Sequence, residues 1–506
     1  MILFALGMLK NLFLEYKFVL LSAILSALAC TEMNILLIFI AWTPLIYSLI
    51  KIDNFKKALL SGFVFGFFNG LLLFNWIYTS LSDYSTNAFL GFFVIIGLSI
   101  INSLLFSVFT SLVFIYKKYF NSKLQILNLI ALASVLTLFE ELVSYIFIGI
   151  PFLNVRTGFT LGKSLYLTQF SVFGGVATLS YIVFFVNICF AEYFFSKSKI
   201  YLKFLIFTLP TIFYIGYLLH SKNPVGNSNG IKVSVVTANI NPKISWNSSN
   251  GNQLAQNFFE LCSKATKNNP DFIVWPESTI PWVLEENDDF LKELKKINAE
   301  KSIQVIGINK PYNKDKVLNA ALFIVPKNMS QYYSKNILLE GFEKPLLKSI
   351  QIPFYINLQY KYATENKIQP VKTKHGKAGV LICNESIEDV LVRNQVNNGA
   401  NFFFIMSNDG WFKDSYISLY HFYIARIMAV AYNKDFAISS NCGYSGFINR
   451  NGDILKISQS NSVFESTHKI FSNDKKTFYS NYPYAFLMLM VIILLTNLFT
   501  LKFFKQ

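Results

Sequence analysis

The sequence predicts a multi-pass α-helical membrane protein that carries an inserted α/β domain. Hydrophobic residues make up 53% of the 506 residues, and Phe alone occurs 52 times, which is far above the usage of a soluble protein. Residues 1–220 contain apolar stretches that mostly reach the length of a membrane-spanning helix. Residues 221–480 instead alternate strand-like and helix-like patterns, which is typical of a layered α/β domain.

The N-terminal region, residues 1–220, is expected to form about seven transmembrane helices. The apolar stretches that predict them are 11–30, 33–50, 58–80, 87–116, 124–143, 163–194 and 201–219. The second is short for a span. A last stretch, at about 484–501, predicts a C-terminal transmembrane helix within residues 481–506.

Basic residues in the loops predict how the chain is oriented. Lysines gather around the start of the first stretch and in or beside every second loop after it: Lys10, Lys17, Lys51, Lys56, Lys57, Lys117, Lys118, Lys123, Lys197, Lys199 and Lys203. The alternate loops contain Arg156 as their only basic residue. Because cytoplasmic loops are the basic ones, the N-terminus is expected in the cytoplasm and residues 221–480 on the far side of the membrane.

One of these far-side loops, 149–158, contains Gly149 and Pro151, which break a helix. It is either a plain connection or a lip of a lipid-facing site. Glu140 and Glu141 precede it near the end of a predicted span. Buried acids are costly there, so Glu140 and Glu141 are expected either to reach the interface or to bind another group.

The α/β region follows a polar linker at 220–230. Its strand-like runs are Lys232–Ile240, Phe272–Trp275, Gln304–Ile308, Ala320–Val325, Ala378–Cys383, Phe402–Met406 and Phe436–Ser440. Helix-like patterns cover 252–267, 287–299, 386–397 and 415–433, and Asn451-Gly452 predicts a hairpin turn.

Three short segments of the α/β region carry residues that suit acyl-transfer chemistry. Cys383 ends one apolar run, Glu277 ends another after Trp275-Pro276, and Lys335 stands beside apolar residues. The ends of strands are where active sites form in open α/β sheets. A thiol, a carboxylate and a lysine can serve as nucleophile, general base and oxyanion stabiliser. A nearby cation is also expected to lower the pKa of the thiol.

Other residues compete for these roles or support them. Lys344 and Lys348 are alternatives to Lys335, and Glu343 and Glu385 could orient the lysine or assist proton transfer. His421 permits a rival Cys–His dyad, although it lies in a helical pattern where packing is the commoner role. Structural alternatives remain for each, namely a buried cysteine, solvated acids and an exposed lysine.

Together, the Trp-Pro-Glu277, Tyr-Ser-Lys335-Asn and Ile-Cys383-Asn-Glu385 segments resemble the Glu–Lys–Cys motifs of the nitrilase superfamily. Combined with membrane spans on both sides, the chain looks like the apolipoprotein N-acyltransferase family over nearly its whole length. Segment 236–240 followed by Trp246 resembles the family's first strand and functional tryptophan. Later similar blocks are 407–412, 425–426 and 439–443, and 149–152 resembles a loop of the family's membrane part.

The resemblance implies an αββα sandwich at 221–480 with Glu277, Lys335 and Cys383 as catalytic residues and no cofactor or metal. It also implies that a phospholipid donates an acyl chain through a Cys383 thioester to the α-amine of a diacylglyceryl-modified lipoprotein. A bacterial inner membrane with the catalytic domain on the periplasmic side would be the location. The chain departs from the family pattern at Asn384, in the loop Glu340-Gly341-Phe342, and at Gly410.

Composition narrows the alternatives. The net charge is +16, but the lysines are scattered among apolar stretches, which favours anionic lipid headgroups over nucleic acid as the partner. The five cysteines and four histidines show no metal-site or disulfide spacing. Two alternatives to the acyltransferase stay open, a membrane-tethered amidase or nitrilase that uses water, and a non-enzymatic transporter or assembly factor with a decayed module.

Overall fold

The computed structural model describes residues 2–84, 88–122, 124–221, 230–242, 244, 246–247, 249–285, 288–298, 302–325, 329–346, 349, 360–412 and 415–503. The chain divides into two compact units. One contains residues 1–146, 152–221 and 482–506, and the other contains residues 147–151 and 222–481.

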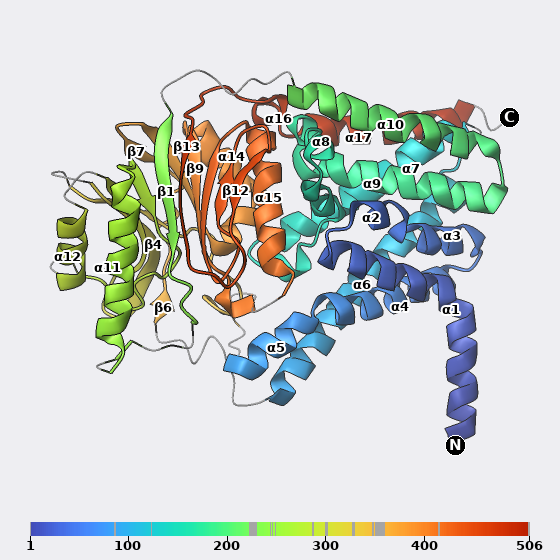
Figure 1. The fold of residues 1–506 in the computed structure, drawn as a ribbon. Helices are drawn as coiled ribbons and strands as arrows, with labels where there is room; N and C mark the ends of the chain where they lie inside the picture. The colour runs from blue at the N-terminus through green and yellow to red at the C-terminus, as the bar shows by residue number, and fades with distance from the viewer. Residues whose placement is uncertain are drawn as a thin grey trace. The chain divides into compact units, whose positions relative to one another are not determined.

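All the regular elements described in the first unit are helices (Figure 1). Its helices are α1 (Ile2–Thr31), α2 (Ile35–Ala41), α3 (Thr43–Lys51), α4 (Phe55–Leu73), α5 (Asn75–Tyr84), α6 (Ala88–Tyr119), α7 (Gln125–Ile146), the 3₁₀ turns η1 (Pro151–Leu153) and η2 (Thr157–Lys163), α8 (Leu165–Thr168), α9 (Ser171–Ser196), α10 (Lys199–Ser221) and α17 (Ala485–Phe503). Among the described residues, six of these helices are long and apolar enough to cross a membrane, namely α1, α4, α6, α7, α9 and α10.

The second expected span, 33–50, is two short helices that meet at Trp42. Asn187 on α9 causes the break, because its Oδ1 accepts hydrogen bonds from the backbone amides of Trp42 (2.9 Å) and Thr43 (3.0 Å). Pro44 follows directly and has no amide to continue the helix. A residue from the sixth expected span therefore decides the shape of the second.

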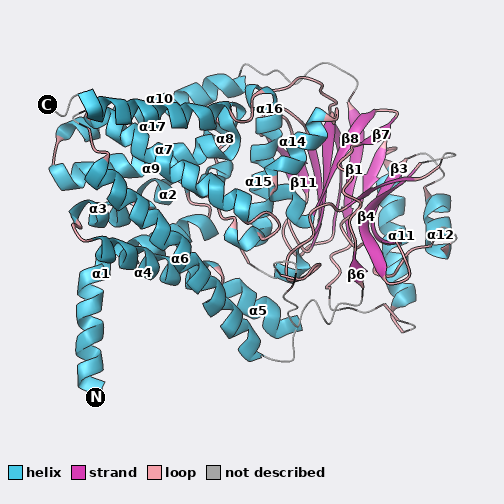
Figure 2. Ribbon diagram, turned by 180° about the vertical axis from the view of Figure 1, so that it is seen from behind, coloured by secondary structure: helices cyan, strands magenta, loops and turns pink. Residues whose placement is uncertain are grey.

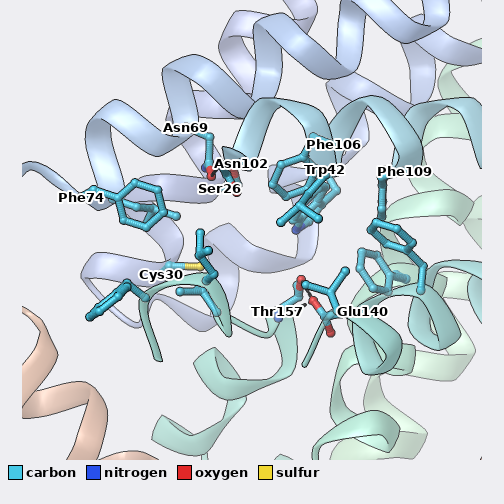
Figure 3. Close-up of a pocket in the computed structure, with 18 residues that line it drawn as sticks. Ser26, Cys30, Trp42, Asn69, Phe74, Asn102, Phe106, Phe109, Glu140 and Thr157 are labelled. Carbon is cyan, nitrogen blue, oxygen red and sulfur yellow. Dashed lines mark hydrogen bonds between the residues drawn. The ribbon is translucent and has the colours of Figure 1, made fainter. Parts of the chain in front are cut away.

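Glu140 and Glu141 both bind the irregular segment that follows α7. The backbone amide and hydroxyl of Thr157 donate to Glu140 Oε1 at 2.7 and 2.6 Å, and Arg156 pairs with Glu141 at 2.9 Å. The paired acids therefore bind another group, namely this segment, which is the second of the two expected alternatives. Glu140 and Thr157 also line a cavity of about 70 Å³, together with the ring of Trp42 (Figure 3).

The second unit is an αββα sandwich, which confirms the expected fold class (Figure 2). The first sheet has the order β13-β1-β2-β3-β4-β5, with β6 also paired to β4, and the second has the order β12-β11-β10-β9-β8-β7. The strands of the first are β1 (Ile231–Thr237), β2 (Phe272–Val274), β3 (Ile303–Pro311), β4 (Lys316–Ile324), β5 (Gln331–Ser334), β6 (Lys361–Tyr362) and β13 (Phe464–Ile470). Those of the second are β7 (Val371–Thr373), β8 (Gly376–Ile382), β9 (Phe402–Asn408), β10 (Phe436–Asn441), β11 (Gly446–Ile448) and β12 (Ile454–Ile457).

Each sheet buries one face against the other sheet and the opposite face against helices. The inner cluster joins residues such as Phe272 on β2 to Phe402 and Phe404 on β9. The helices α11 (Gly251–Lys267) and α12 (Asp289–Ile297) cover the first sheet, and α14 (Asp389–Asn397) and α15 (Ile417–Tyr432) cover the second (Figure 1). The short elements η3 (Cys383–Ile387), η4 (Asp409–Phe412) and α16 (Phe478–Asn481) complete the unit.

The expected strand-like runs all form strands, and the predicted turn at Asn451-Gly452 joins β11 to β12, which pair antiparallel. The strands β1, β2 and β3 run parallel to one another, as do β8, β9 and β10. Glu277 follows β2, Cys383 follows β8 and Asp409 follows β9, so their side chains start from the carboxyl ends of strands, where open sheets expose backbone and loops to a ligand.

Candidate active site

Cys383 occupies a strained turn at the end of β8. Its φ angle is +54°, in the left-handed region, which costs a residue with a side chain about 1–2 kcal/mol. The residue begins the 3₁₀ turn η3 and is 9% exposed. Backbone strain at a nearly buried thiol that ends a core strand is typical of a functional position.

Glu277 is held in a nearly buried position by three groups. Asn319 Nδ2 donates to its Oε1 at 2.8 Å, the backbone amide of Asn408 donates to its Oε2 at 3.1 Å, and Lys335 Nζ lies 3.3 Å from Oε1. The donors come from both sheets, so the carboxylate bridges the sandwich. Its rotamer is therefore set before any substrate arrives, as a general base requires.

Lys335 is the most buried of the expected catalytic residues, with only 1% of its surface exposed. Its Nζ lies 3.0 and 2.9 Å from the two oxygens of Glu343, in addition to its contact with Glu277. Glu343 is anchored in turn by the backbone amide of Leu339, at 2.8 Å from Oε2. The expected role of Glu343 in orienting the lysine is thus matched by a direct ion pair.

Asn319, which was not among the predicted site residues, joins the two carboxylates. Its Nδ2 donates to Glu277 Oε1 and also to Glu343 Oε1, at 2.8 and 3.1 Å. The residue lies in the middle of β4, where an asparagine is unusual in a buried strand. That polar interruption of an apolar run was the available signal.

Glu385 does not bind the lysine but organises the backbone around it. Its Oε1 accepts hydrogen bonds from the amides of Asn336 (2.6 Å) and Ile337 (3.1 Å), and its Oε2 accepts one from the amide of Ile382 (2.9 Å). The hydroxyl of Tyr333 donates to the same carboxylate. One fully buried side chain therefore ties the segment after Lys335 to the strand that presents Cys383.

The expected lowering of the thiol pKa is wrong. Burial raises the pKa of Cys383 well above its usual range, and Glu277 raises it further, while Lys335 opposes both. Three carboxylates, Glu277, Asp409 and Glu343, raise the pKa of the thiol, whereas Lys335 is the one cation that lowers it. Burial alone would lower the pKa of Lys335, but Glu343 and Glu277 outweigh it and raise that pKa well above its usual value. The resting pair is a neutral thiol and a charged lysine.

His421 is engaged by Asp409 and not by the thiol. Its Nδ1 lies 3.4 Å from Asp409 Oδ1, and its ring packs against Phe412. Burial would raise the pKa of Asp409, but its hydrogen bonds, with His421 first among them, lower it. No hydrogen bond or ion pair among the described residues joins His421 to Cys383, which leaves the rival dyad without support.

Trp246 lies apart from the contacts just described. It is half-buried, and its ring packs against Trp282, Phe258 and Phe290, with the ring centres 5.3 to 6.3 Å apart. These rings belong to the outer cluster between the first sheet and its helices. The structure thus places Trp246 in a packing cluster, and its functional role stays a prediction.

The three departures from the family pattern have local explanations. Asn384 Nδ2 donates to the carbonyl of Ile337 at 3.1 Å, which adds a second link between the thiol turn and the lysine segment. Within the changed loop, Glu340 pairs with Lys344 at 2.9 Å, so Lys344 is engaged away from the reacting groups. A Cβ on Gly410 would lie 2.5 Å from the ring of Pro242, so this position has no room for alanine. Lys348 lies outside the described residues.

The segment 147–151 belongs to the same unit as the site. The amide of Gly149 donates to Glu388 Oε1 at 2.9 Å, and its carbonyl accepts from the amide of Glu340 at 3.1 Å. Its φ of +83° suits glycine. The loop is therefore more than a plain connection, because it braces the segment that carries Glu343.

Comparison with known proteins agrees with this geometry. Residues 232–462 match the carbon-nitrogen hydrolase family model, and residues 22–189 match the model of the apolipoprotein N-acyltransferase N-terminal domain. Apolipoprotein N-acyltransferases of three bacteria are similar over most of the chain. The Borreliella burgdorferi protein is 26% identical over 83% of this chain and 81% of its own length. The Wigglesworthia glossinidia brevipalpis protein is 28% identical over 81% and 83%, and the Thermotoga maritima protein 26% over 92% and 89%.

The membrane helices, the αββα unit and both family matches lead to one assignment. The chain belongs to the apolipoprotein N-acyltransferase family, an acyltransferase family within the carbon–nitrogen hydrolase superfamily.

Proposed function

We propose that this chain transfers a fatty acyl group from a phospholipid, through a thioester on Cys383, to the α-amine of a diacylglyceryl-cysteine at a lipoprotein N-terminus. The observation that carries the proposal is the contact of a nearly buried base, Glu277, with a fully buried lysine, beside a thiol whose pKa is raised. A thiol that stays protonated at rest needs a base at the moment of attack, and Glu277 is in place to supply it.

In the first half-reaction Glu277 removes the Cys383 proton and the sulfur attacks the ester carbonyl. Lys335 is charged and held in place by Glu343, so its positive charge stabilises the tetrahedral oxyanion through space. When the carbon–oxygen bond breaks, Glu277 returns its proton to the leaving oxygen. The products are a thioester on Cys383 and a lysophospholipid.

In the second half-reaction the amine attacks the thioester carbonyl, and Glu277 accepts a proton from the attacking nitrogen. Lys335 again faces the oxyanion. Collapse of the intermediate forms the amide and expels the Cys383 thiolate, which regains the proton from Glu277. A thioester is reactive enough for an amine to open, so no nucleotide is required.

The names of the relatives support a lipoprotein as the acceptor, and the apolar helices support a membrane lipid as the donor. The basic loops favour a cytoplasmic N-terminus, with residues 221–480 as a catalytic domain on the periplasmic side of a bacterial inner membrane and the C-terminal helix returning to the cytoplasm. Both substrates are lipids, so a site tethered to the membrane at both ends would meet them at the bilayer.

The test is the intact mass of the purified protein after incubation with phospholipid vesicles. An acyl adduct that hydroxylamine removes, and that Cys383→Ser abolishes, is expected. Cys262→Ser is the matched control, because Cys262 is also buried but lies on α11, where Gln304 Nε2 contacts its sulfur at 3.1 Å. A folded wild type that gives no adduct with any phospholipid would contradict the proposal, and loss of the adduct to water alone would favour a hydrolase.

A further inference from the structure

Several residues pair with one edge of β4 and face the other sheet. Tyr362 is the one next in line to Lys335. Along one edge of β4, Tyr333 pairs with Ala321, Lys335 donates its amide to the carbonyl of Asn319 at 2.8 Å, and Tyr362 pairs with Val317. The three partners on β4 are two residues apart, and side chains two apart share one face of a sheet. Tyr333 and Lys335 both point to the inner face, so Tyr362 is the next inner-face residue in the row.

The residue after Tyr362 fixes this orientation independently. Ala363 packs against the outer cluster between the first sheet and its helices. Successive residues of a strand point to opposite faces, so Tyr362 must point inward, toward the side where Asn319 joins Glu277 to Glu343. Figure 1 shows β6 beside one end of β4.

The charges of the site act on the Tyr362 hydroxyl. Burial raises the pKa of this phenol, and Glu343 and Glu277 raise it further, while Lys335 opposes them. The hydroxyl therefore stays protonated and can donate a hydrogen bond. It makes none to the described residues, although the ring is partly buried.

The donors already in the site are occupied. The Lys335 ammonium contacts both oxygens of Glu343 and one oxygen of Glu277, and the Asn319 amide contacts the same two carboxylates. A hydrogen-bond donor that has no other partner would further stabilise the leaving alkoxide while Glu277 delivers its proton. The Tyr362 hydroxyl, on which the charges of Glu343 and Glu277 act, is a neutral donor that makes no hydrogen bond to the described residues.

We propose that Tyr362 is a catalytic residue whose hydroxyl hydrogen-bonds the leaving oxygen of the donor ester in the first half-reaction. The same hydroxyl accepts a hydrogen bond from the attacking amine in the second, because a phenol both donates and accepts. Glu277 still delivers the proton to the leaving oxygen, so atoms and charges balance as before. The role rests on the proposed acyl transfer and assigns a residue outside the Glu–Lys–Cys set.

The experiment compares two acyl donors in single-turnover acylation of Cys383, followed by intact mass. With phospholipid, Tyr362→Phe is expected to slow acylation roughly 10- to 100-fold, the loss of one hydrogen bond made in the transition state. With a p-nitrophenyl fatty ester the rate should change less than about twofold, because nitrophenolate leaves without a donor. Tyr332→Phe, on the adjacent strand and bonded to Glu365 at 2.8 Å, should keep the wild-type rate with both donors.

The outcomes separate this role from a structural one and from the proposed function. An equal loss with both donors, or no loss with phospholipid, would overturn the role of Tyr362. The unchanged nitrophenyl ester rate also demonstrates that the variant is folded. A wild type that forms no adduct with either donor would refute acyl transfer itself, and the role of Tyr362 with it.

Discussion

Asn319→Ala offers the sharpest test of how the site is held together. The substitution removes the side chain that donates to Glu277 at 2.8 Å and to Glu343 at 3.1 Å. Hydrogen bonds to charged groups contribute about 1.5–3 kcal/mol each. If the orientation of Glu277 depends on one of them, acylation of Cys383 should slow roughly 10- to 150-fold.

The assay is the single-turnover rate of hydroxylamine-sensitive adduct formation, beside the thermal stability of each variant. Asn298→Ala is the matched control, since this buried asparagine donates to the carbonyl of Ser302 at 2.6 Å and lies outside the site. It should lose stability without losing rate. Acylation of Asn319→Ala at the wild-type rate would refute the view that Asn319 orients the base.

Three further predictions concern the supports of the site and of the helical unit. Burial raises the pKa of Glu385 to about 7; its protonation is therefore favoured in the folded state, so its contribution to stability is complete below about pH 4.5 and is lost as the pH rises to about 7. Acylation should nevertheless fall as the pH drops below about 7, since protonation removes an acceptor for the lysine segment. The free energy of unfolding should depend on pH with different slopes in the wild type and in Glu385→Gln, and parallel slopes would contradict the stability prediction. Gly149→Ala should slow acylation by roughly two- to tenfold, because the φ angle of Gly149 is +83° and a left-handed alanine costs about 1 kcal/mol. The control is Gly251→Ala, at a position where an added Cβ meets open space. Equal acylation rates of the two variants would count against bracing by this loop. Glu140→Ala should unfold more easily than Glu140→Gln by about 1–3 kcal/mol in detergent melts, because only glutamine keeps an acceptor for Thr157; identical melts would rule out this anchor.

Local sequence patterns predicted much of the fold and the three main residues of the candidate site. The apolar stretches, the seven strand-like runs and the Glu277, Lys335 and Cys383 motifs are short segments whose periodicity or residue types can be read without knowing their neighbours. The break of the second expected span at Trp42 could not be read in this way, because it depends on Asn187, 145 positions away.

The sequence by itself determined that this is a membrane protein with an inserted α/β domain, and which thiol, acid and lysine to consider. Only the tertiary structure decided what surrounds them. Asn319 lies between two carboxylates, and Glu385 accepts hydrogen bonds from the backbone. Tyr362 pairs with β4 on the same edge as Lys335. The tertiary structure also reversed the expected pKa shift of Cys383. The physical reason is that burial and through-space charges come from segments far apart in the chain, and their sum is defined only once the sheets have packed.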